Sequence, residues 1–449
     1  MTESKIIKTL IVSSLILILA GSLAFLKQGR LGSVSQYALK ALNKDAASLS
    51  QVILETAGWR EEKEFLILFQ NNLEIRPSGG YLGNFGILKI KNGQILSLET
   101  HDTNIFDGFG QIQTTPPQPI QKYLKINNWQ MRDSNWSPDF PTTAQKVEDF
   151  YHLQGGQEKF DGVIAVNASV LPELLELIGP IYLEKYDKEF TSENVLYELE
   201  YEVEKGYVQR NISEGNRKEV FKALIEKVTE KMAVENIADI FQYKDFAFDQ
   251  LEAKNIMLYF RDQGVQEKAS QLGWTGQINK DYTYDYLMIN EANLGARKSN
   301  YFIERSVKYF IDLNQEKPQV NLKITFKHTG QKKDWFNHDY LCYLRIYAPQ
   351  DSWLEEAKEI SSQTSFSEEF NKTVFGQWIE VPTGQSKTIE FTYTLPQNIL
   401  NESFYRLMIQ KQSGLDSLPV EIKVKTGEDI YSKKLEINQD WQGEVLLEK

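Results

Sequence analysis

The sequence of 449 residues predicts an α/β (α+β) layered domain and a C-terminal immunoglobulin-like β-sandwich, placed after one N-terminal transmembrane helix. Three observations support this prediction. A long uncharged segment lies near the N-terminus, strand-like and helix-like segments alternate in the middle of the chain, and the C-terminal part alternates apolar and polar residues between turns. We expect a cytoplasmic tail and anchor over 1–30, a helical stalk or first helix over 31–60, an α/β domain over 61–281 and a β-sandwich over 282–449.

The uncharged segment near the N-terminus has the length of a membrane span. Thr9–Leu26 comprises 18 residues without a charge, close to the roughly 20 that cross a bilayer core. A cleaved signal peptide is the competing interpretation, with Ser22-Leu23-Ala24 as its cleavage site. We favour an uncleaved anchor because the apolar segment exceeds the roughly 7–15 residues of a signal core. Basic residues flank both ends of the segment, so the charge rule does not fix its orientation. We expect the simplest topology, a single-pass membrane protein with an extracytoplasmic body.

Residue patterns predict the following elements in chain order. Apolar spacing of three and four indicates a helix over 33–56. The apolar run Phe65–Phe69 predicts a strand buried on both faces that ends at Gln70, Asn71 and Asn72. Further predictions are a hairpin of 87–90 with 95–98, helices over 142–151, 171–178 and 216–232, a strand over 162–166, and sandwich strands over 320–326, 340–347, 388–395, 404–409 and 420–424.

Composition limits the classes of partner and cofactor. The net charge of -12 and the sequence pI of about 5.1 argue against a nucleic-acid partner, because phosphate affinity needs clustered Lys and Arg. Cys342 is the only cysteine, which excludes an intrachain disulfide and a cysteine-based zinc cluster. The four histidines lack metal-ligand spacing, and the common nucleotide-binding, metalloprotease and hydrolase motifs are missing. The sequence gives no oligomeric state.

Two polar segments are candidates for a binding site. Arg76 is followed by Pro77, Ser78, Gly79 and Gly80, and backbone N–H groups at paired glycines beside a guanidinium suit a carboxylate or phosphate. The alternative is a polar hairpin with a solvated arginine. A second loop, 132–141, precedes a helix and contains polar and aromatic side chains; its alternative role is helix capping by Asp139 and packing by the aromatic rings.

Several of these segments together resemble a bacterial family called domain of unknown function 4012. The resemblance rests on FQNNLEIRPSGG, SNWSPDFP, FDGVIAVNASVLPELLELIGPI and NRKEVFKALIEKV, in that order. It covers about 65–232, and NLGARKSNYF at 293–302 is similar to the family's continuation into a β-rich tail. The family carries no established activity.

The layout also resembles, more distantly, the LytR-CpsA-Psr phosphotransferases, which move glycopolymers from a polyprenyl pyrophosphate carrier to the cell wall outside the membrane. This resemblance implies that Arg76 holds pyrophosphate, Asp102 binds magnesium, Asn135 lies in the family's asparagine loop and Arg217 opens a helix. The sequence departs from the family pattern at several positions. Asparagines, small residues, a histidine and glutamates replace the expected acidic and arginine residues at 71–72, 78–80, 101 and 198–202.

Two functional hypotheses follow. The first is an envelope phosphotransferase in which Arg76 and Asp102 are catalytic, with Asp102 or Asp139 as the metal ligand. Its substrate-binding residues would be Arg132, Asn135, Asp139, Arg210, Arg217, Ser78, Gly79 and Gly80. The second is a noncatalytic envelope protein that binds a cell-wall glycan or lipid-linked glycopolymer or acts as a scaffold, with Trp129, Trp136 and Tyr151 stacking on sugar rings. Convergence of the arginines on one pocket would favour the enzyme.

Overall fold

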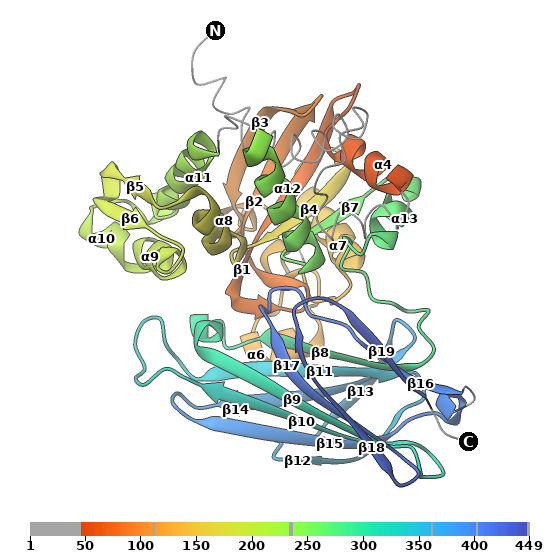
Figure 1. The fold of residues 1–449 in the computed structure, drawn as a ribbon. Helices are drawn as coiled ribbons and strands as arrows, with labels where there is room; N and C mark the ends of the chain where they lie inside the picture. Colours follow the sequence, from red (N-terminus) through yellow and green to blue (C-terminus); the bar gives the residue numbers. More distant parts are fainter. Residues whose placement is uncertain (1–45, 111–112, 233–236, 361, 401–402, 447–449) are drawn as a thin grey trace. The chain divides into compact units, whose positions relative to one another are not determined.

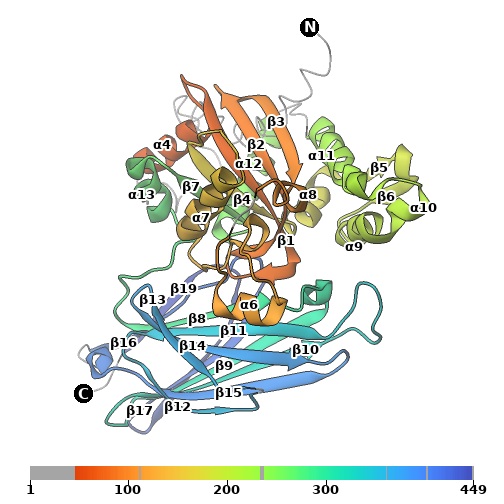
Figure 2. The same ribbon diagram turned by 180° about the vertical axis from the view of Figure 1, so that it is seen from behind.

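A computed structural model describes residues 46–110, 113–232, 237–360, 362–400 and 403–446. The described chain forms two compact units (Figures 1 and 2). Of the described residues, those within 46–70, 82–110 and 140–276 form unit 1, and those within 71–81, 113–139 and 277–446 form unit 2. The predicted anchor and residues 33–45 of the predicted helix lie outside the described residues. Within the described ranges, no helix has the length and apolar character of a membrane span.

Unit 1 is built around a mixed five-stranded sheet in the order β3-β2-β1-β4-β7. Its strands are β1 (Lys63–Arg76), β2 (Gly79–Lys91), β3 (Gln94–Asp102), β4 (Gly162–Asn167) and β7 (Ile256–Phe260). β1 and β4 are parallel with Phe65 opposite Gly162, whereas β2/β3 and β4/β7 are antiparallel. The predicted hairpin is confirmed, and Asn92 and Gly93 at its turn both have positive φ.

The predicted end of the first strand at Gln70–Asn72 is wrong, because β1 continues to Arg76. The polar residues beyond Gln70 have partners inside unit 2, so the backbone does not need to leave the extended conformation. The Asn72 side chain donates to Gly414 O at 3.0 Å, and Ile75 N donates to the Asn300 side chain at 3.1 Å. Long-range partners therefore override the local signal for a turn.

Helices cover the sheet of unit 1 and form a smaller subcore (Figures 1 and 2). α4 (Ala46–Thr56) and α13 (Gln263–Gln271) share a hydrophobic core with β1, β4 and β7. The three predicted helices over 142–151, 171–178 and 216–232 are confirmed as α7 (Phe140–Leu153), α8 (Val170–Ile178) and α11 (Glu219–Lys231). The remaining elements are α5 (Thr103–Phe106), β5 (Ile181–Leu183), η2 (Glu184–Tyr186), β6 (Lys188–Phe190), α9 (Val195–Tyr201), the π-helical η3 (Glu202–Gly206), α10 (Tyr207–Gln209), η4 (Glu214–Asn216) and α12 (Ile237–Glu252).

Unit 2 contains the strand-rich C-terminal region that the sequence predicts, together with residues from 71–81 and 112–139, and its two six-stranded sheets share one hydrophobic core. One sheet contains β12 (Trp353–Lys358), β15 (Ser386–Thr394), β10 (Gln319–His328), β9 (Ile303–Asp312), β17 (Leu418–Thr426) and β18 (Asp429–Ile437) in that order. The other contains β13 (Ser365–Glu369), β14 (Lys372–Val381), β11 (Tyr340–Pro349), β8 (Asp285–Asn293), β16 (Phe404–Ile409) and β19 (Trp441–Leu446). Short helices α6 (Gln118–Leu124), η1 (Met131–Asp133), η5 (Lys298–Phe302) and η6 (Gln397–Leu400) complete the unit.

All five strands predicted in this region are confirmed, within β10, β11, β15, β16 and β17. Most pairs are antiparallel, but β16/β8 and β17/β9 are parallel. The immunoglobulin-like topology stays a prediction.

β8 is a strand that the sequence patterns did not identify. All nine of its residues are buried, although Asp285, Asn290, Glu291 and Asn293 are polar. Each of these side chains has a hydrogen-bond partner: Asp285 accepts from the hydroxyls of Tyr309 and Tyr405, and Glu291 accepts a two-pronged contact from Arg305 at 2.6 and 2.9 Å. Buried polar side chains are tolerated when they have hydrogen-bond partners. β8 can therefore be a buried strand although its sequence does not alternate apolar and polar residues.

The buried carboxyl of Asp285 makes the stability of unit 2 pH-dependent. Burial raises the pKa of Asp285 to about 6, although the two tyrosine hydroxyls partly oppose this. The folded state then binds a proton more tightly than the unfolded state, so stability from this group is present at low pH and is lost as pH rises from about 4 to 6. We predict that the free energy of unfolding of the parent protein falls by about 3 kcal/mol relative to Asp285→Asn over this interval.

Urea unfolding of both proteins at several pH values between 4 and 7.5 measures this difference, because all other titrating groups are common to the pair. Parallel stability curves would show that Asp285 does not titrate in this range.

Candidate functional site

The candidate site predicted around Arg76 lies at the tip of the β1–β2 hairpin, within unit 2. Only Pro77 and Ser78 connect the two strands. Gly79 has a φ of 132°, and a Cβ added to Gly80 would lie 2.2 Å from the carbonyl carbon of Asn71. Close approach of the two backbones therefore explains the paired glycines without a bound anion.

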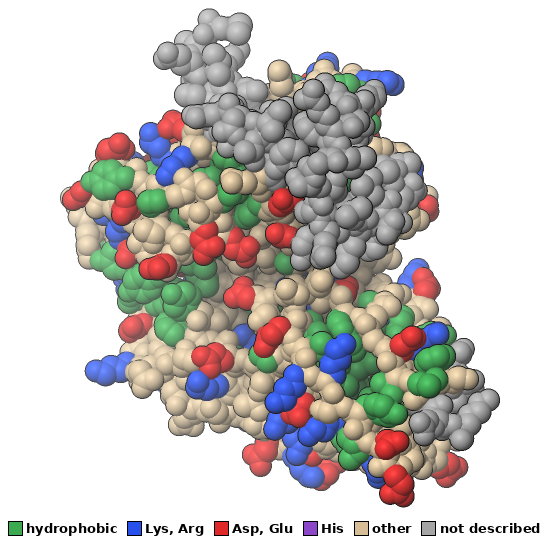
Figure 3. All heavy atoms as spheres, viewed as in Figure 1, with side chains coloured by type: hydrophobic (Ala, Val, Ile, Leu, Met, Phe, Trp, Pro, Cys, Tyr) green, Lys and Arg blue, Asp and Glu red, His purple; other side chains and the backbone are tan. Residues whose placement is uncertain are grey.

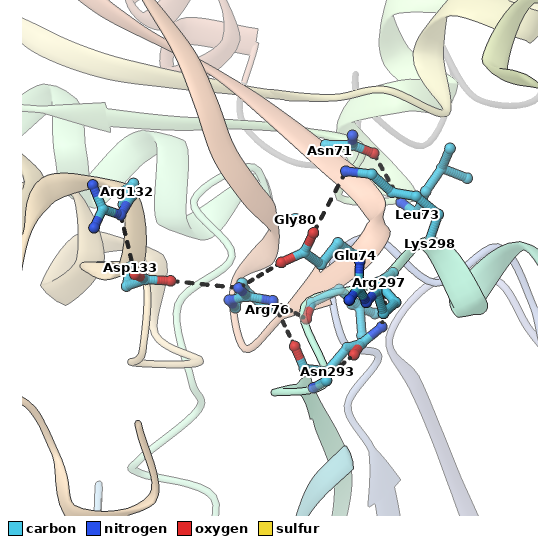
Figure 4. Close-up of polar contacts among 12 residues, drawn as sticks. Asn71, Leu73, Glu74, Arg76, Gly80, Arg132, Asp133, Asn293, Arg297 and Lys298 are labelled. Atoms are coloured by element: carbon cyan, nitrogen blue, oxygen red, sulfur yellow. Dashed lines mark hydrogen bonds and ion pairs between the residues drawn. The ribbon is translucent and has the colours of Figure 1, made fainter. Parts of the chain in front are cut away.

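Arg76 is buried, with 2% of its surface exposed, and its guanidinium contacts two carboxylates. Nη2 donates to Glu74 Oε1 at 2.8 Å and to Asp133 Oδ1 at 3.4 Å, while Nη1 donates to the Asn293 carbonyl at 2.7 Å (Figure 4). Lys298 lies 3.4 Å from the other oxygen of Glu74. The cluster thus combines two carboxylates with cations from β1, η1 and η5 (Figure 4).

Electrostatics of the cluster favour a charged, closed network. Burial acts to lower the pKa of Arg76, but Glu74 and Asp133 outweigh it and the pKa is raised. Burial raises the pKa of Asp133, and Arg76 and Arg132 offset only part of that shift. The neighbouring Tyr81 hydroxyl has its pKa raised to about 12, first by burial and then by the two carboxylates. The Tyr81 phenol therefore stays neutral beside arginines and carboxylates that compensate each other's charge, which fits a structural role for this ion cluster.

Amide side chains fix the hairpin tip further. Gln412 donates to Arg76 O at 3.1 Å, Asn290 donates to Pro77 O at 2.8 Å, and Asn135 donates to Gly80 O at 2.7 Å. These three contacts place carbonyl groups of the tip against β8, a loop after β16 and the loop after η1. Asn135, expected in a substrate loop, therefore hydrogen-bonds the backbone of the predicted glycine pair.

The other predicted residues of unit 2 are engaged in similar contacts. Arg132 Nε lies 3.7 Å from Asp133 Oδ2, so Arg132 and Arg76 share one carboxylate. Asp139 accepts from Ile278 N at 2.9 Å. Trp136 lies under the Arg345 guanidinium, 4.4 Å from ring centre to Cζ. The Trp136 contact agrees with the packing role in the alternative interpretation, whereas capping of α7 by Asp139 stays a prediction.

Arg210 and Arg217 belong to unit 1, and each contacts its own carboxylate. Arg210 makes a two-pronged contact with Glu202 at 2.8 and 3.1 Å and donates to Tyr186 O at 2.6 Å. Burial acts to raise the pKa of Glu202, but Arg210 and Lys188 outweigh it and the pKa is lowered. Arg217 Nη1 lies 3.3 Å from Glu204. The glutamates that replace arginines in this segment hold basic side chains.

Asp102, the predicted magnesium ligand, also lies in unit 1 and has a basic partner. Its Oδ2 is 3.0 Å from Lys218 Nζ, and its Oδ1 accepts from Asn104 N at 2.8 Å as the N-cap of α5. Lys218 also donates to Gly83 O at 2.7 Å. An ammonium beside a single carboxylate does not fit a magnesium site, which needs several free oxygen ligands. Among the described residues, no group of three or more His, Cys, Asp or Glu side chains could hold a metal ion.

Sequence reasoning missed the partners of these residues. Asp133 is 57 positions from Arg76, and Asn293 is 217 positions away, so no local pattern connects them. Lys218 pairs with Asp102. No signal in the sequence indicated this pair apart from the position of Lys218 directly after Arg217. Tyr151, a predicted sugar-stacking residue, is buried and packs against Phe85 and Phe106.

The face of the molecule shown in Figure 3 carries charges of both signs. On the face shown in Figure 3, the described Lys and Arg side chains are interspersed with Asp and Glu side chains, without an extended basic patch. Mixed charges of this kind produce little net steering of a charged ligand.

Comparison with known protein families supports the first of the two resemblances over part of the chain. Residues 60–203 match the family described as "Protein of unknown function (DUF4012)". The match covers both units' contributions to β1 and β2, together with α7, β4 and α8. No curated protein matches the chain.

Solved structures with partial likeness include TagV of B. subtilis, a LytR-CpsA-Psr protein, at 16% identity and a TM-score of 0.25, covering 48% of this chain and 81% of TagV. Lin1025 of Listeria innocua has 12% identity and a TM-score of 0.26, covering 47% and 80%. The protein lpg2210 of Legionella pneumophila has 11% identity and a TM-score of 0.23, covering 31% of this chain and 66% of its own. TM-scores at this level carry no argument about function.

We predict that Arg76→Ala destabilises the protein by about 3–5 kcal/mol, because it leaves Glu74 and Asp133 buried without their shared cation. Arg217→Ala, which removes a partly exposed pair, should cost less than about 1 kcal/mol. Thermal or urea unfolding of the two variants beside the parent protein gives both values. Equal stability of Arg76→Ala and the parent would contradict a structural role for the cluster.

Proposed function

We propose that this protein is a noncatalytic, single-pass cell-envelope protein whose extracytoplasmic body binds an envelope glycan. One observation carries the proposal. Each arginine that a phosphotransferase site would use contacts a carboxylate of the same chain: Arg76 with Glu74 and Asp133, Arg132 with Asp133, Arg210 with Glu202, and Arg217 with Glu204.

Compensated arginines are poor groups for phosphoryl transfer. Transfer of a phosphoryl group depends on cations aimed at oxygens that gain charge in the transition state. A guanidinium already bound by a carboxylate must lose that partner before it can bind pyrophosphate, and Arg76 is also shielded from solvent. Asp102 has an ammonium where a metal ion would be required. These features support binding without catalysis.

The envelope location rests on separate observations. The uncharged segment Thr9–Leu26 is the basis for the anchor, and the resemblance of the sequence to the LytR-CpsA-Psr phosphotransferases, which act outside the membrane, is the basis for the envelope. We propose further that unit 2 is an immunoglobulin-like sandwich that contacts a surface component. Loops at the ends of such sandwiches commonly carry binding residues.

The proposal is tested with the full-length chain in detergent micelles. We expect it to bind soluble glycan fragments of the cell wall without magnesium, with the same affinity in the parent protein and in Arg217→Ala, as measured by isothermal titration calorimetry. We also expect no release of polyprenyl phosphate when the chain is incubated with a lipid-linked glycopolymer and an acceptor glycan.

Magnesium-dependent binding of a polyprenyl pyrophosphate analogue that is lost in Arg217→Ala would overturn the proposal in favour of the phosphotransferase. Absence of glycan binding by the folded parent protein would overturn it in favour of a scaffold.

A further inference from the structure

A cavity of about 510 Å³ lies within unit 2, away from the Arg76 cluster. Four segments line it: 280–283 before β8, 349–351 from the end of β11 into the turn before β12, Asn371 between β13 and β14, and 396–398 after β15, extending into η6. Its volume falls in the range of small-molecule sites. None of the residues singled out from the sequence belongs to it.

The lining side chains are suited to hydroxyl groups. Four carry amides, namely Gln350, Asn371, Gln397 and Asn398, and two carry carboxylates, namely Asp281 and Asp351. Amides donate and accept together, and carboxylates accept from two directions, so adjacent hydroxyls of one ligand can be paired. Lys280 is the one cation among the lining residues. The two carboxylates outnumber it, which disfavours an anionic ligand.

Contacts behind the lining hold the first loop in place. The buried Lys372 ammonium donates to Tyr282 O at 3.1 Å and to Lys280 O at 3.5 Å, and lies 4.9 Å from the centre of the Tyr286 ring. The Asn371 amide donates to Lys280 O at 3.4 Å. A cavity whose wall is fixed by buried contacts loses little freedom when a ligand binds.

An exposed indole lies beside this cavity along the chain. Trp353 is 72% exposed and comes two residues after the lining residue Asp351. Its backbone pairs with Thr394 on β15, two residues before the lining residue Pro396. An indole combines a large apolar ring with a polar N–H, so it can pack against a ligand that has both apolar and polar surface.

We propose that this cavity binds a neutral carbohydrate, with the amides and carboxylates pairing ring hydroxyls and Trp353 packing against the apolar face of a sugar. This inference rests on the proposed function for the choice of a glycan, and it adds the position of the site and the absence of charge on the ligand. Tyr282 supplies a second ring in the lining. An apolar ring beside hydroxyl-pairing groups matches the two kinds of surface on a sugar.

The test uses the full-length chain in detergent micelles and neutral tetrasaccharides of glucose, mannose and N-acetylglucosamine as probes. We expect at least one of them to bind, and we expect Trp353→Ala and Asp351→Asn each to weaken that binding at least tenfold by calorimetry. Asp351 has a φ of 65°, and asparagine is among the residues that tolerate this conformation, so Asp351→Asn tests the carboxylate rather than the backbone.

Trp59→Ala is the matched control, since Trp59 is 49% exposed and belongs to unit 1. It should leave the affinity unchanged. Glycan binding that survives both cavity variants overturns this inference alone and leaves the proposed function standing. Failure of the parent chain to bind these probes, together with binding of charged cell-wall fragments, overturns the neutral ligand; failure to bind any glycan overturns the proposed function as well.

Discussion

The burial of Arg76 is the constraint on which the hairpin tip and its surroundings depend. A guanidinium that has lost its water needs carboxylates and carbonyls at hydrogen-bond distance, and here Glu74, Asp133 and Asn293 supply them. Arginine suits this place better than lysine, because its planar fork can contact three acceptors in fixed directions. Strand β8 supplies one of those acceptors through the main-chain carbonyl of Asn293, and the side chain of its Asn290 donates to Pro77 O at the hairpin tip.

The pairing of each arginine with a carboxylate also explains the charge pattern at the other predicted site residues. At 198–202, where the resemblance implies arginines, the sequence has glutamates, and one of them, Glu202, is bound to Arg210; the nearby Glu204 is bound to Arg217. These glutamates neutralise the charge of the arginines they contact, so the arginines do not form a cluster of uncompensated cations. The positions of the arginines alone do not show that each has a carboxylate partner.

The regular part of the fold could be predicted from the sequence because period-2 and period-3.6 patterns reflect one buried face. That reasoning identified the β2–β3 hairpin, α7, α8, β4 and the five sandwich strands. It failed for β8, whose buried Asp285 and Glu291 rely on partners from other strands, and for 71–76, whose polar side chains read as a turn. Two of the three acceptors of Arg76, Asp133 and Asn293, come from segments distant in the sequence, so their assembly needs the tertiary structure. In the sequence, the cavity residues Asp351 and Asn371 have the pattern of ordinary turn residues, and Trp353 has the pattern of an ordinary strand residue.

The contrast between the hairpin tip and the cavity shows why residue type alone misplaces a binding site. Both contain Asn, Asp and basic side chains, but at the tip these groups contact one another and the backbone, and Arg76 is closed to solvent. At the cavity, Lys372 holds the loop from behind, while the amides of Gln350 and Asn398 stay at an accessible surface. Polar groups whose hydrogen bonds stabilise the fold have little capacity left for a ligand, whereas polar groups on loops fixed by buried contacts keep it. The loops of unit 2 therefore offer recognition that the conspicuous arginine motif does not.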